Sequence, residues 1–70
     1  PSADGLTVGV EGNIWVATEE GIQVYAPDGS LWGTIEVPQH PSNCAFGGED
    51  GNLLYVTARD TLFQVPIAIR

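Results

Sequence analysis

The sequence has very little positive charge. Only Arg59 and Arg70 are basic, against nine acidic residues, so the formal net charge is -7. Nucleic-acid backbones and anionic membrane surfaces are bound through Lys and Arg, and an acidic surface would repel both. The composition therefore predicts neither a nucleic-acid partner nor a membrane partner.

Cysteine, histidine and long apolar segments are also scarce. Cys44 is the single cysteine, so no intrachain disulfide can form, and no nearby cation or second cysteine would activate its thiol. We expect a small, buried apolar residue at that position. His40 has no metal-ligand spacing with another residue and is expected to be a solvated loop histidine. No apolar run reaches the length of a membrane span, and a soluble, cytoplasmic location is expected.

A sustained helical period is absent, and short runs rich in β-branched and aromatic residues take its place. Gly and Pro separate these runs, and Pro27-Asp28-Gly29 fits a type I turn in which Asp28 has a structural role. The sequence therefore predicts an all-β fold. The expected strands are residues 6–10, 13–18, 21–26, 30–37, 44–48, 53–58 and 61–69.

The chain repeats itself after about 40 residues. That shift aligns Leu6 with Phe46 and Trp15 with Tyr55, and it places Cys44 opposite Asp4. A repeat of this length, holding about four short strands, is the signature of a β-propeller blade. The side chains of Trp15, Tyr55 and Phe63 are expected to pack between blades.

The repeat divides the chain into two expected blades. Residues 1–38 carry four predicted strands, and residues 39–70 carry three. Two blades cannot close a ring, which needs at least about four of them. Because the chain also begins without methionine, we expect a fragment of a larger propeller, or a unit that associates with other copies of itself.

Several segments resemble one known family, that of gluconolactonase, regucalcin (senescence marker protein) and luciferin-regenerating enzyme. The matching stretches are "DGLTV…EGNIWVAT", "GIQVYAPDGSLWGTIEVP" and "PSNCAFGGEDGNLLYVTA", and "TLFQVPIAIR" is similar to the C-terminal strand of bacterial members. The resemblance implies a six-bladed β-propeller with one divalent cation at a mouth of its central channel. Ca²⁺ is the expected ion, with Mg²⁺, Mn²⁺ and Zn²⁺ as alternatives.

The resemblance also implies a metal ligand at Asp4. The family takes a Glu, an Asn and an Asp from different blades, and Asp4 matches the Asp, although Ala3 replaces the usual Pro before it. Asp4 would bind the ion, orient water or accept its proton. Without the resemblance, an Asp-Gly before a strand is more often a turn. Asn43 is a possible channel-lining residue, or its side chain ties down the loop around Pro41.

The implied function is that of a metal-dependent hydrolase of sugar lactones or related cyclic esters. The Glu and Asn ligands would lie outside these 70 residues, so the isolated chain is expected to be inactive. The alternative is a non-enzymatic propeller module, because unclosed sheets leave edge strands that need partners. Such a module would self-assemble as a trimer or a swapped dimer, or act as a binding scaffold.

Overall fold

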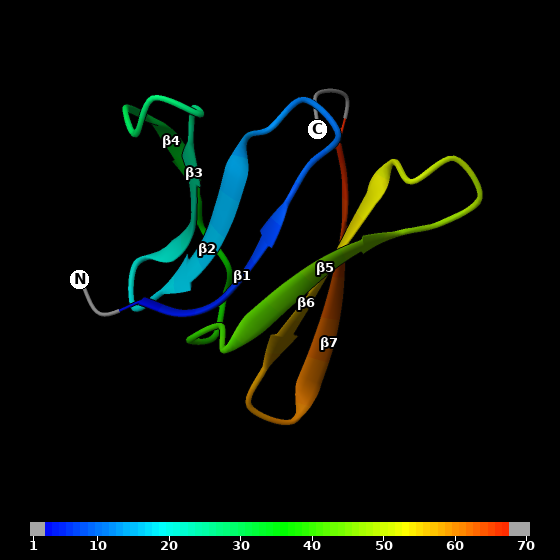
Figure 1. Cartoon of the computed structure of the whole chain (residues 1–70). Coiled ribbons are helices and arrows are strands. Elements are labelled where there is room, and N and C mark those ends of the chain that lie inside the picture. The colour runs from blue at the N-terminus through cyan, green and yellow to red at the C-terminus, as the bar shows by residue number, and fades with distance from the viewer. Residues whose placement is uncertain (1–2, 68–70) are drawn as a thin grey trace.

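The computed structural model describes residues 3–67, and every regular element among them is a β-strand (Figure 1). The prediction of an all-β fold is therefore confirmed. The strands are β1 (Ala3–Val8), β2 (Ile14–Thr18), β3 (Gly21–Tyr25), β4 (Leu31–Ile35), β5 (Asn43–Gly47), β6 (Leu53–Ala58) and β7 (Thr61–Pro66).

The strands form two antiparallel sheets, and in each sheet every strand pairs with the next one along the chain. The first sheet has the order β1-β2-β3-β4, and the second has the order β5-β6-β7. The first strands of the two sheets, β1 and β5, lie side by side, and the sheets diverge from there (Figure 1). This arrangement is that of two neighbouring propeller blades, whose innermost strands line the central axis.

The turn between β3 and β4 shows how the local sequence sets the pairing. Gly29 has a φ of 93°, in the left-handed region that favours glycine. The carboxylate of Asp28 accepts hydrogen bonds from the backbone amide and the hydroxyl of Ser30, at 2.9 and 2.7 Å. Asp28 is therefore a turn residue, as predicted.

The hydrophobic core lies between the two sheets. Leu54 and Val56 of β6 are fully buried against Trp15 and Ile22 of the first sheet. The ring of Trp15 meets that of Phe46 edge to face, with centroids 5.2 Å apart. The buried members of this cluster are Trp15, Ala17, Ile22, Val24, Cys44, Leu54 and Val56, and Phe63 packs against them.

Three sequence-based expectations are corrected by the structure. The first strand begins at Ala3 rather than at residue 6, so Asp4 lies within the strand and not in a turn before it. Trp15 and Phe63 do pack between the sheets, but Tyr55 lies on the opposite face of β6. The last strand ends at Pro66, and residues 68 and 69 of the expected strand fall outside the described residues.

Candidate functional site

Asp4 lies in a β-bulge at the start of the innermost strand of the first sheet. Ala3 pairs with Thr18, but Leu6 pairs with Val16, so β1 holds one more residue than β2 in this interval. An extra residue of this kind bends the strand and changes the direction of a side chain, and such bulges are common beside active sites. Asp4 is exposed.

The bulge separates Asp4 from the regular part of its strand, in which Leu6 and Val8 are exposed like Asp4 itself. Strand alternation would place residue 4 on the same face as Leu6 and Val8. On the second sheet, the face equivalent to that of Leu6 carries Cys44 and Phe46 and is turned into the core. Because the extra residue falls between Ala3 and Leu6, Asp4 lies in the irregular part of β1 and outside the regular ladder with β2.

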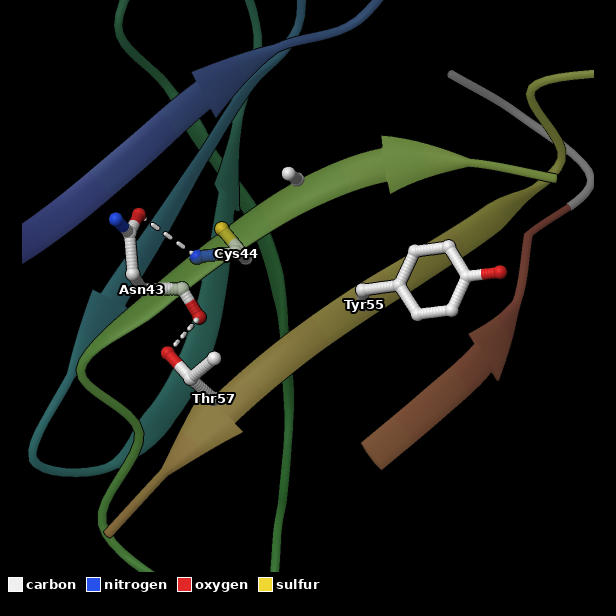
Figure 2. A pocket seen from close by; sticks show the side chains of 5 residues that line it. Asn43, Cys44, Tyr55 and Thr57 are labelled. Atoms are coloured by element: carbon white, nitrogen blue, oxygen red, sulfur yellow. Dashed lines mark hydrogen bonds between the residues drawn. The ribbon is translucent and has the colours of Figure 1, made fainter. Parts of the chain in front are cut away.

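The start of β5 provides polar groups next to this bulge. The amide of Gly5 donates a hydrogen bond to the carbonyl oxygen of Ser42, at 2.9 Å. The side-chain Oδ1 of Asn43 accepts from the backbone amide of Cys44 at 2.8 Å, and the Thr57 hydroxyl donates to the Asn43 carbonyl oxygen at 3.4 Å (Figure 2). The structure therefore brings Asn43 close to the residue that follows Asp4.

Cys44, the repeat equivalent of Asp4, has a purely structural environment. It is 6% exposed, and its Sγ donates to the carbonyl oxygen of Trp15 at 3.4 Å across the two sheets. Burial raises the pKa of the Cys44 thiol. The expectation of a small buried residue is confirmed. Without a bulge, the same scaffold position faces the core, which explains why a carboxylate is absent from the second copy.

A shallow pocket of about 170 Å³ lies on the outward face of the second sheet, lined by Asn43, Cys44, Ala45, Tyr55 and Thr57 (Figure 2). Tyr55 and Thr57 are the repeat equivalents of Trp15 and Ala17, whose face is covered by the other sheet. We therefore interpret this hollow as a surface for packing against another sheet rather than as a ligand site.

The described residues do not assemble a metal site by themselves. Within residues 3–67, no group of three or more His, Cys, Asp or Glu side chains is placed to hold an ion. Asp4 is the one acidic residue within β1 and β5, and His40 is exposed, as expected of a loop histidine. No helix in the described part of the chain is long and apolar enough to cross a membrane.

The geometry defines a class of protein: two blades of a β-propeller, with an exposed carboxylate at the start of an innermost strand. Residues 1–60 match the model of the SMP-30/gluconolactonase/LRE-like region. The chain belongs to this family, as the resemblance had indicated.

Individual relatives agree with this assignment. The chain is 38% identical to the gluconolactonase of Zymomonas mobilis over 64 residues, which cover 89% of the chain and 18% of that protein. It is 41% identical to bovine regucalcin over 64 residues, covering 84% of the chain and 21% of regucalcin. A pentonolactonase of Haloferax volcanii is 44% identical over 57 residues, covering 77% of the chain and 20% of that protein.

The fold of the chain also matches a solved structure. An X-ray structure of a candidate gluconolactonase superimposes with a TM-score of 0.92 and 36% identity, covering 99% of the chain and 24% of that protein. The chain therefore spans about a fifth of the length of the curated relatives that it matches.

Asp4 as a metal ligand stays a prediction, and sequence reasoning missed both the bulge around it and the contacts that Ser42 and Thr57 make beside it. A signal was present for the bulge, since an isolated glycine inside a strand pattern often marks one, and Gly5 is such a glycine. The side chain of Ser42 gave no signal for its contact with Gly5, because that contact is made by a backbone carbonyl oxygen that any residue would supply.

Proposed function

We propose that the chain forms part of a divalent-metal-dependent lactonase, a hydrolase of sugar lactones or related cyclic esters. The observation that carries the proposal is the exposed Asp4 carboxylate in the bulge of the innermost strand, in a chain that belongs to this family. The similarity to a gluconolactonase and a pentonolactonase supports the substrate class.

Asp4 fits a hard cation in its donor chemistry. Ca²⁺ and Mg²⁺ take oxygen ligands, and a carboxylate supplies two of them. In the described part of the chain, the Asp4 side chain makes no hydrogen bond that would compete with a cation, whereas Asp28 is committed to Ser30. Ca²⁺ is our first choice, with Mg²⁺, Mn²⁺ and Zn²⁺ as alternatives, and the remaining ligands would come from other blades.

In such a reaction, Asp4 is the residue of this chain that would take part in the chemistry. When bound, the ion polarises the lactone carbonyl and lowers the pKa of coordinated water. The Asp4 carboxylate would hold the ion or accept a proton from the attacking water, since it is exposed at the start of the innermost strand. Water adds to the carbonyl carbon, the ring C–O bond breaks, and the product is a hydroxy acid. The backbone on either side of Asp4 is held by the pairing of Ala3 with Thr18 and by the hydrogen bond from the Gly5 amide to Ser42.

A segment exchange tests this function. The matching segment of the Zymomonas mobilis gluconolactonase is replaced by the aligned residues of this chain, and gluconolactone hydrolysis is measured with each of the four metals. We expect metal-dependent turnover in this exchange protein and a loss of at least about a hundredfold with Asp4→Asn. Full activity of the Asp4→Asn variant would contradict the assignment of Asp4. The isolated 70-residue chain is expected to be inactive.

A second candidate function is assembly with further sheets of the same kind. One observation favours it. The outward face of each sheet carries residues whose counterparts in the 40-residue repeat are packed in the core of the other sheet. Leu6 and Val16 correspond to Phe46 and Val56, and Tyr55 corresponds to Trp15. The outward faces expose large apolar side chains, namely Leu6, Val8 and Leu62. The two outward faces are therefore suited to one another, as in a head-to-tail ring.

The mass of the chain in solution tests this second candidate. Light scattering should give a particle of about 22 kDa, three times the 7.4 kDa of one chain, if copies rebuild a six-bladed ring. Leu6→Lys should dissociate that particle, whereas Thr34→Lys on the exposed outer strand β4 should not. A monomer would remove this candidate and leave other blades of a longer chain as the partners.

A further inference from the structure

The bulge that carries Asp4 is held by contacts from the other sheet. The shift in register leaves Asp4 and Gly5 outside the regular ladder between β1 and β2. The amide of Gly5 is bonded instead to the carbonyl oxygen of Ser42, just before β5. The conformation of the bulge therefore depends on how the two innermost strands meet.

Asn43 forms the second contact. A Cβ atom built on Gly5 would collide with the carboxamide of Asn43, so the side chain of Asn43 packs directly against the Gly5 backbone. Gly5 does not have a positive φ, so glycine is needed here for space and not for backbone conformation. The carboxamide is fixed in turn by the hydrogen bond from the Cys44 amide to Oδ1 (Figure 2).

The chemistry of the Asn43 side chain favours a supporting role over direct metal ligation. Its oxygen, the only atom of the carboxamide that binds cations, uses one of its two lone pairs for the Cys44 amide at 2.8 Å, and it is also the side-chain atom nearest to a Cβ built on Gly5. Its Nδ2 group is a donor and is not a cation ligand. Contact with Gly5 is therefore what Asn43 contributes to the neighbourhood of Asp4.

We propose that Asn43 and Gly5 form a clamp that sets the direction of the Asp4 carboxylate, so that Asn43 is a positioning residue for the cation ligand. The proposal rests on the proposed function, because it assigns Asn43 a role in that same site. Without the carboxamide, glycine at position 5 would leave the bulge free to adopt several conformations. Outer contacts of this kind typically change metal affinity by about 10- to 100-fold.

The clamp predicts a metal-free result in the 70-residue chain. Asn43→Ala should raise the hydrogen-exchange rate of the Gly5 amide by about 3- to 10-fold, the effect of losing one net hydrogen bond. In the parent chain the Asp4 Hα–Hβ coupling constants should be those of one rotamer, and in Asn43→Ala they should be averaged over several rotamers. Asn43→Asp, which keeps an acceptor of the same shape, should restore both values. The matched control is Thr57→Ala, which removes a hydroxyl from the same cluster without touching Gly5.

The same variants predict a result for metal binding in the exchange protein. By calorimetry, Asn43→Ala should weaken the affinity for the divalent ion by about 10-fold or more, and Thr57→Ala should leave it within about twofold. Gly5→Ala should weaken it as well, because its new methyl group displaces the carboxamide. Urea unfolding of each variant checks that the sheets remain folded.

The two proposals fail in different ways. If Asn43→Ala changes neither the Gly5 exchange rate nor the Asp4 couplings, or if it changes them without altering metal affinity, the clamp is overturned. If Asp4→Asn itself leaves metal affinity unchanged, the proposed function is wrong. The Gly5 rate and the Asp4 couplings then still decide whether Asn43 holds the bulge.

Discussion

Replacement of Leu54 by Ala tests whether the two sheets share one core. Leu54 is fully buried between the sheets, and the change removes three carbon groups, worth about 0.8 kcal/mol each or about 2.4 kcal/mol together. The remaining cavity raises the expected loss to about 3–4 kcal/mol, since paired strands cannot collapse into it. A folded chain of 70 residues has only about 4–10 kcal/mol in total. Leu54→Ala should therefore remove between about a third and nearly all of the stability.

The neighbouring strand offers a matched control. Leu62 is 60% exposed on β7, so Leu62→Ala should cost about 0.5 kcal/mol or less. Urea unfolding is followed by the fluorescence of Trp15, whose ring contacts Phe46 of the other sheet, in a Trp32→Phe background. Equal losses for the two leucines would refute a core between the sheets.

Two further predictions follow from the titrating groups. Hydrogen bonds from Ser30 hold the pKa of Asp28 below its ordinary 3.8, so the turn gains stability above pH 3.8 and loses it as the pH falls through the lower folded pKa. The stability difference between the parent and Asp28→Ala should therefore shrink in acid, and a difference independent of pH would contradict this account. Burial raises the pKa of the Cys44 thiol, so iodoacetamide at pH 7.5 should alkylate the folded chain at least roughly tenfold more slowly than the urea-unfolded chain. Equal rates would place Cys44 at the surface.

The all-β fold was predictable because its signals are local. Turn residues such as Gly29 and the alternation of apolar residues depend on neighbours in the sequence, and these set the strand pairs. The 40-residue repeat supplied the relation between the two sheets, since equivalent residues must meet equivalent faces.

The geometry around Asp4 was not predictable in the same way. At the bulge, the absence of a side chain on Gly5 leaves room for the side chain of Asn43. Asn43 lies 38 positions later in the chain, so no local pattern encodes that contact. Tyr55 shows the same limit. Its aromatic character predicted a place between blades, but only the register of β6 determined which of the two faces it occupies.

Calcium titration of the exchange protein tests the central claim most directly, because it measures the role of one carboxylate. We predict a single divalent site whose affinity falls by at least about a hundredfold with Asp4→Asn and is unchanged by Asp28→Asn, a carboxylate confined to a turn. Equal calcium affinity in the parent and in Asp4→Asn would contradict the account.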